Sequence, residues 1–123
     1  PHNSFIASGF WNPNPVDLLR IRKELEMDAH ELREIIDDKT FKMFWGDIQG
    51  DVVKTSPKGF NIEHPDIDLI RHKQYLFIKK FDDKSVISPG FQKEVIEHFT
   101  AIRPFFDYMT NVLTTDLNGI SLL

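Results

Sequence analysis

SPKGFNIEHPDIDLIRHKQYLFIKKF, which covers residues 56–81, is the stretch of sequence that decides the fold. Its proline–glycine start keeps the backbone irregular. Pro65 then opens a helix of one or two turns, with Asp66 and Asp68 near the positive end of that helix. Residues 75–78 are apolar on both faces, which is typical of a covered central strand. The segments before and after this stretch are therefore expected to contain the elements that cover the strand.

The first part of the sequence, up to about residue 36, predicts one strand and two helices. Residues 4–8 are a short β-prone run that ends at Gly9. Asn14 is a suitable N-cap for a helix over residues 15–27, which has a proline at its first position. Residues 28–31 have the form of a capping box, so a second helix is predicted to start there.

Further helices are predicted on both sides of the central stretch. Aromatic residues at helical spacing mark a short third helix over residues 41–45. Residues 82–83 predict a turn, and Ser88 is expected to cap a last helix that Pro104 kinks or splits. The apolar stripe of that helix is predicted to begin with Phe91, Val95, Phe99 and Ile102. The apolar residues 120–123 are expected to bury against another part of the protein.

These elements predict an α+β fold, mostly helical, with four or five helices around a small sheet of two or three strands. The strands are far apart in the sequence, which favours an α+β arrangement over βαβ winding. A chain of 123 residues is expected to form a single domain over residues 1–123. Because a two-stranded sheet is marginal by itself, the sheet is expected to belong to a larger α/β domain.

The composition excludes several classes of protein. The formal net charge is −4, which argues against binding to a nucleic-acid backbone, since that role needs a basic face. There is no cysteine, so disulfides and thiolate chemistry are excluded, and a reducing cytoplasm is the expected location. No apolar run approaches the roughly 20 residues of a membrane-spanning helix, so no membrane partner is expected. No cofactor-binding motif is present.

Several short motifs in order along the chain resemble one bacterial family, the conserved hypothetical proteins known as domain of unknown function 2461. They are Gly9-Phe10-Trp11-x-Pro13-x-Pro15, Ile21-Arg22, Phe41, Pro57-x-Gly59-Phe60, His64-Pro65, Leu69-x-x-x-Lys73 and Pro104-Phe105. The activity of this family is not established, so the resemblance implies no catalytic residues.

The resemblance also implies something about length. Members of the family are about twice as long as this chain on the usual domain scale. The chain is therefore expected to be the C-terminal half of a longer protein. The expected partner of the strands at Phe5 and Tyr75 is the missing N-terminal half, or a second copy in a homo-oligomer.

One group of side chains has the chemistry of a metal site. His64, Asp68 and His72 would share a helix face at i, i+4 and i+8, with Asp66 close by, and nitrogen and oxygen ligands suit a metal ion. Pro65, however, places His64 outside the helix, and the helix dipole alone explains the two aspartates. The structural explanation of these residues is favoured over a metal site, so no metal is expected.

A second group would suit a small anion. Lys54, Lys58, Arg71 and Lys73 lie close in the sequence, and the helix that opens at Pro65 offers free backbone donors to a phosphate or carboxylate. The alternative is a solvated rim whose lysine stems lie over neighbouring aromatic rings.

A third group lies near the start of the chain. Trp11, beside two asparagines, could line the mouth of a pocket. The alternative is that Trp11 covers the core while Asn14 only caps a helix.

Two functions remain compatible with these patterns. The first is a non-catalytic binding or accessory domain. The alternative is an enzyme acting on a small anionic substrate, with His64 as acid/base and with Lys58, Arg71 or Lys73 holding the anion. The enzyme requires His64 and at least two of those cations to converge within about 2.6–3.2 Å of one ligand position. A His64 ring bonded to neighbouring backbone would favour the first function.

Overall fold

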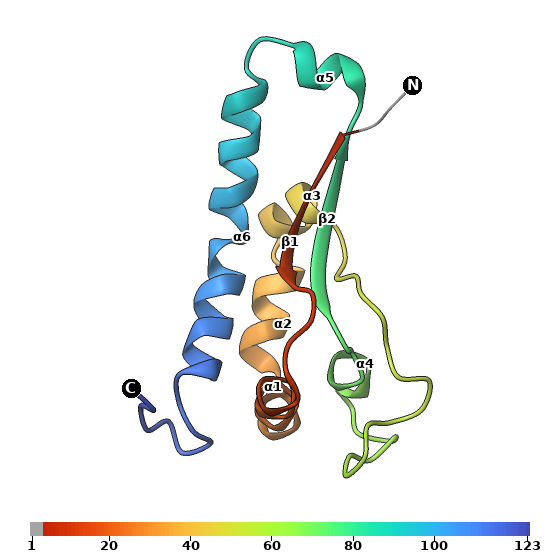
Figure 1. Cartoon of the computed structure of the whole chain (residues 1–123), viewed down its shortest axis with the longest axis vertical. Coiled ribbons are helices and arrows are strands. Elements are labelled where there is room, and N and C mark those ends of the chain that lie inside the picture. The colour runs from red at the N-terminus through yellow and green to blue at the C-terminus, as the bar shows by residue number, and fades with distance from the viewer. Residues whose placement is uncertain (1–3) are drawn as a thin grey trace.

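The computed structural model describes residues 4–123. Figure 1 shows a pair of strands with the long C-terminal helix on one side and the shorter helices around them. The elements are β1 (Ser4–Phe10), α1 (Pro15–Met27), α2 (His30–Asp37), α3 (Lys39–Trp45), α4 (Ile67–Ile70), β2 (Tyr75–Phe81), α5 (Asp83–Ile87) and α6 (Phe91–Leu113). The predicted α+β class is confirmed, although residues 4–123 contain six helices rather than four or five. Across the same residues, no helix is long and apolar enough to cross a membrane.

The sheet consists of β1 and β2, which pair antiparallel. Phe10 is opposite Tyr75, and because side chains alternate along a strand, Ile6, Phe10 and Phe77 face the helices and join the core. Tyr75 and Phe77 are fully buried and Leu76 nearly so, which confirms the predicted covered strand. β1 continues through Gly9 to Phe10, two residues beyond its predicted end.

The starts of α1 and α2 are capped in different ways. The side chain of Asn14 accepts a hydrogen bond of 2.8 Å from the backbone N–H of Asp17, which confirms the predicted N-cap of α1. The predicted capping box of α2 is wrong. Ala29 occupies the N-cap position and makes no side-chain bond, while Asp28 accepts from the N–H of His30 at 2.9 Å. An aspartate turn before the helix therefore replaces the reciprocal box.

The segment after β2 contains a helix that the sequence did not predict. Asp82 accepts a hydrogen bond of 2.7 Å from the N–H of Ser85 and so caps α5, where a turn was expected. Ser88 ends α5 instead of capping the last helix, and α6 starts at Phe91 after Gly90. Gly90 has a φ of 91°, a left-handed conformation that favours glycine and separates the two helices.

The buried face of α6 also differs from the predicted stripe. Its buried residues are His98, Ile102, Phe105, Tyr108, Met109 and Val112. Phe99, which was placed in the stripe, has 48% of its surface exposed. Pro104 lies inside the helix, and α6 continues past it to Leu113 without being split.

The core is built from aromatic rings that meet edge to face. The ring of Phe77 lies 4.9 Å from that of Phe41 and 5.1 Å from that of Phe105, so β2 is held between α3 and α6. His98 is buried nearby, with its ring 4.7 Å from Phe44, and its backbone carbonyl accepts from the Trp45 indole at 2.8 Å. Edge-to-face pairs of this kind add to the stabilisation from burial alone.

The last residues do not bury as predicted. Ile120 and Leu122 are more than half exposed, and Leu123 is 98% exposed. The segment is held by backbone contacts instead, since the N–H of Leu122 donates to the carbonyl of Thr114 at 2.8 Å. Nothing in residues 4–123 covers these apolar side chains.

Candidate functional site

The predicted residue His64 lines a cleft of about 440 Å³ where the end of α1 meets the start of α2. Its lining residues are Glu26, Met27, Asp28, Ala29, His30, Arg33, His64, Pro65 and Asp66. One of the candidate residues that the sequence singled out therefore lies beside a cleft. The chemistry available there depends on which of these side chains have free polar atoms.

Both ring nitrogens of His64 are bonded to backbone. Nδ1 accepts from the N–H of Asp66 at 3.0 Å, and Nε2 lies 3.0 Å from the carbonyl oxygen of Glu26. Because Nδ1 is the acceptor, Nε2 carries the hydrogen and donates to Glu26. Glu26 belongs to the last turn of α1, whose carbonyls lack partners within the helix. The ring therefore caps the C-terminus of α1 and fixes the turn before α4.

Asp66 and Asp68, the predicted carboxylate ligands of a metal, instead bind Arg33 of α2. The Nε of Arg33 donates to Asp66 at 2.9 Å, and its two terminal nitrogens donate to Asp68 at 3.1 and 2.6 Å. Burial acts to raise the pKa of Asp68, but the hydrogen bond and charge of Arg33 outweigh it and lower that pKa. The same hydrogen bond raises the pKa of Arg33. This bidentate pair joins α2 to α4.

His72, the fourth predicted ligand, points into the protein. It is 7% exposed, its Nδ1 donates to the carbonyl of Gln74 at 3.0 Å, and its ring centre lies 5.3 Å from that of Tyr75. Burial lowers the pKa of His72. Among residues 4–123, no three histidine, aspartate or glutamate side chains are grouped so that they could hold a metal ion.

The predicted anion-binding cations do not converge. The guanidinium of Arg71 donates to the carbonyl of Val53 at 2.7 Å and to the carbonyl of Lys54, so it fastens the loop before the central stretch. Lys58 and Lys73 are exposed. In the part of the chain that the structure describes, no hydrogen bond or ion pair links any of these cations to His64.

Trp11 lies in the loop between β1 and α1 and has 50% of its surface exposed. The expectation that it covers the core is therefore wrong. Its neighbour Phe10 takes that role, with its ring 6.2 Å from Phe105 and 6.0 Å from Phe106. Trp11 is not among the lining residues of the cleft beside His64 or of two hollows along α6, so none of these three has it at its mouth.

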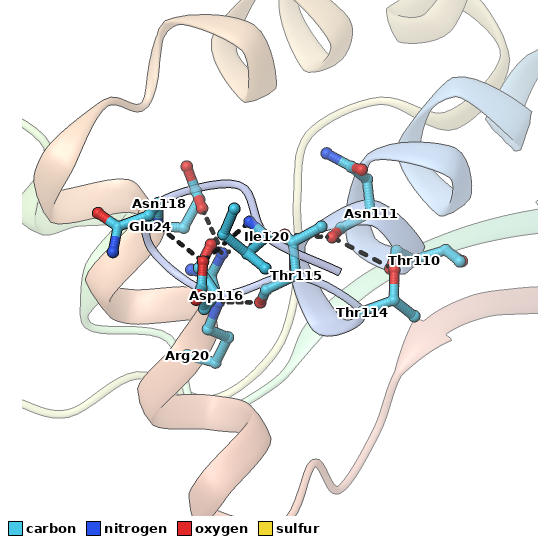
Figure 2. Close-up of polar contacts among 9 residues, drawn as sticks. All are labelled: Arg20, Glu24, Thr110, Asn111, Thr114, Thr115, Asp116, Asn118 and Ile120. Atoms are coloured by element: carbon cyan, nitrogen blue, oxygen red, sulfur yellow. Dashed lines mark hydrogen bonds and ion pairs between the residues drawn. The ribbon is translucent and has the colours of Figure 1, made fainter. Parts of the chain in front are cut away.

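Two arginines of α1 make contacts that sequence reasoning missed. Figure 2 shows Arg20 reaching from α1 to the segment after α6, where it donates to the carbonyls of Thr115 and Asp116 at 2.8 and 2.9 Å and pairs with Glu24. Arg22 donates at 2.9 Å to the carbonyls of residues 70 and 72. No sequence signal marks the bonds to backbone carbonyls, because these partners lie about 50 to 96 residues away.

The side chain of Asp116 organises the turn that Arg20 holds. It accepts hydrogen bonds of 2.9 Å from the backbone N–H groups of Asn118 and Ile120 (Figure 2). The hydroxyl of Thr115 donates to the carbonyl of Asn111 at 2.7 Å. These bonds hold the turn together and fasten it to the end of α6.

Comparison with known proteins agrees with the resemblance seen in the sequence. The profile of a family described as "Conserved hypothetical protein (DUF2461)" matches residues 1–108. Curated proteins and solved structures gave no significant match. That the chain is the C-terminal half of a longer protein stays a prediction. Because the matched region covers most of its length, the chain belongs to the family of conserved hypothetical proteins DUF2461.

Proposed function

We propose that this chain is a non-catalytic binding or accessory domain whose strand β1 pairs with a further strand. That strand would come from another part of the same polypeptide or from a second copy. The observation that carries the proposal is the edge of β1. One side of Ser4–Phe10 pairs with β2, and within residues 4–123 no strand pairs with the other side.

The sequence of β1 supports this pairing. Natural edge strands are protected by charged side chains, prolines, bulges or short length. SFIASGF has seven residues and contains neither a charge nor a proline. Phe5 keeps 62% of its surface exposed, and two strands alone make a marginal sheet. A third strand would satisfy the open backbone groups and cover Phe5.

The geometry around His64 supports a non-catalytic role. A general base needs a ring nitrogen that can reach substrate, whereas both nitrogens of His64 already bond to Asp66 and Glu26. No observation favours the alternative enzyme acting on a small anionic substrate. A location in the bacterial cytoplasm belongs to the same proposal, and the cysteine-free sequence supports it.

The proposal is tested by measuring the particle mass and the hydrogen exchange of the β1 amides at a series of protein concentrations. On dilution, the outward-facing amides of β1 should exchange quickly. They should become protected as light scattering shows the 14.4 kDa chain associating. In a longer natural polypeptide that contains this chain, the same amides should be protected at every concentration.

Two matched variants identify the surface involved. Phe5→Lys places a charge on the open strand and should abolish both the association and the protection of β1. Val16→Lys changes another exposed apolar residue, which is 77% exposed on α1, and should leave both unchanged. If β1 stays unprotected in the associated chain and in the longer polypeptide, the proposal is wrong.

A further inference from the structure

A groove between α2, α3 and α6 has a chemistry that the proposed function does not use. Two hollows of about 450 and 260 Å³ share Thr40, Thr100 and Ala101 in their walls, so they form one continuous depression. We call it the acidic groove. Along α6 it extends from Glu97 to Pro104, which corresponds to about 10 Å of helix.

The floor of the acidic groove is apolar. It is formed by Ile35 of α2, Phe41 and Phe44 of α3, and Ala101 of α6. Phe41 is almost completely buried, and the other three are half-buried. Ala101 is the smallest of the four, so an incoming apolar side chain has room above it.

The rim of the acidic groove is negatively charged. Glu34, Asp38 and Glu97 line it and are exposed, and the linings of both hollows include no lysine, arginine or histidine. The nearby cation Lys42 is directed elsewhere, because its ammonium group lies 2.7 Å from Asp47. Glu34 pairs with the ring of His30 at 2.8 Å, and Asp38 accepts from the N–H groups of Thr40 and Phe41 at the start of α3. Neither contact comes from a lysine or an arginine, so the rim keeps an excess of negative charge over an apolar surface.

Pro104 changes the backbone hydrogen bonding of this wall. A proline has no N–H, so the carbonyl of Thr100, four residues earlier, loses its regular helical partner. Both residues line the groove. The hydroxyl of Thr100 already donates its hydrogen to the carbonyl of Ile96 at 2.9 Å, so it does not offer a donor to a ligand. The polar groups of this wall thus favour an occupant that donates hydrogen bonds.

From this complementarity we infer that the acidic groove binds a basic amphipathic peptide segment of a partner protein. An apolar side chain of the segment rests on Ala101 and the two phenylalanines, and flanking lysines or arginines reach Glu34, Asp38 and Glu97. Small ligands are usually held in sites that bury most of their surface. This groove has exposed walls and about two helical turns of length, which suits a helix laid along it. The surface is separate from the open edge of β1.

The test measures the binding of a defined probe to the whole chain by fluorescence anisotropy. The probe is a labelled peptide of about 14 residues, with leucine at helical i, i+3, i+4 spacing and lysine elsewhere. The control peptide carries glutamate in place of lysine. We expect salt-sensitive binding of the lysine peptide and none of the glutamate peptide.

Matched variants separate the groove from general attraction to a chain of net charge −4. Glu34→Gln with Glu97→Gln removes two charges from the groove and should weaken binding on the order of tenfold. Asp51→Asn with Glu63→Gln removes two exposed charges outside it and should change binding less than about twofold. Ala101→Leu fills the floor and should weaken binding without removing a charge.

Five results would overturn the inference. The glutamate peptide could bind equally well, the two charge pairs could have equal effects, or Ala101→Leu could have none. The other two would assign the groove to a different occupant. Displacement of the probe by butylammonium alone would assign the groove to a small organic cation. Self-association of the chain that Glu34→Gln with Glu97→Gln abolishes would assign it to a second copy.

Discussion

The two hydrogen bonds of His64 make it a structural residue, and its replacement should change stability. His64→Ala removes the cap on the last turn of α1 and the bond to Asp66. We expect the free energy of unfolding to fall by about 1–2 kcal/mol. His30 is the matched control, because its pair with Glu34 is exposed and its loss should cost less than about 0.5 kcal/mol. Urea denaturation near neutral pH measures both, and equal losses would remove the capping role from His64.

Two buried tyrosines should respond in opposite directions to the loss of a hydroxyl. The hydroxyl of Tyr108 is buried and has no hydrogen-bond partner in residues 4–123, whereas that of Tyr75 donates to the carbonyl of Leu69 at 2.9 Å. A buried polar group without a partner costs stability, and one with a partner contributes to it. Tyr108→Phe should therefore raise the free energy of unfolding by about 1 kcal/mol. Tyr75→Phe should lower it by a similar amount, and thermal denaturation will show whether the signs differ.

At the scale of elements, the pairing of β1 with β2 depends on Gly9. Its φ is 134°, and an added Cβ would lie 2.1 Å from the carbonyl oxygen of Tyr75. Gly9→Ala should therefore destabilise the chain by more than about 3 kcal/mol, or prevent folding. Gly59→Ala is the control, because φ there is 88° and nothing lies within 4 Å of the added Cβ. Its cost should be only the conformational strain of about 1–2 kcal/mol, and similar costs at both sites would contradict the close approach of the strands.

Elements were predictable where a local signal was unambiguous. Asn14 marked the start of α1, and the apolar run at residues 75–78 marked β2. The two aspartates after β2 were misread because an aspartate favours both turns and helix N-caps, and only the bond from Ser85 distinguishes the two. The face of α6 was misplaced around Phe99 because the core is completed there by His98, a polar residue that a hydrophobic pattern omits.

The candidate site was less predictable than the fold. The sequence identified His64 and the aspartates of α4 as chemically notable, and the structure gathers His64, Asp66 and Arg33 around one cleft. The sequence could not identify the partners of these side chains. Arg33 is 35 residues from Asp68, and such contacts follow from the tertiary fold, in which α4 packs on α1, rather than from local spacing.

At the scale of the whole molecule, arginines of the first two helices hold distant segments in place. Arg20 binds the turn after α6, Arg22 binds the end of α4 and the segment after it, and Arg33 binds the acids at the start of α4. Each spans a junction where helix ends or loops expose carbonyls or carboxylates. Burial lowers the pKa of Arg22, but an arginine stays charged at any ordinary pH, so these contacts do not titrate near neutrality. Histidine is therefore the residue type that can make the stability of this chain depend on pH near neutrality.

His72 should make the chain less stable as the pH falls below about 6.5, the ordinary pKa of histidine. Burial lowers the pKa of His72 in the folded chain, and the charge of Arg71 acts in the same direction, against the opposing effects of Gln74 and Asp68. Between the lowered pKa and 6.5 the unfolded chain binds more protons, so the stabilisation is complete above 6.5 and is lost as the pH decreases through that window.

Replacing His72 with a side chain that does not titrate should remove this dependence on pH. His72→Gln keeps a donor for the carbonyl of Gln74 and should flatten the dependence of unfolding free energy on pH between about pH 7.5 and 5. Urea titrations across this range decide the matter. If the slope survives in His72→Gln, another group must carry the pH dependence.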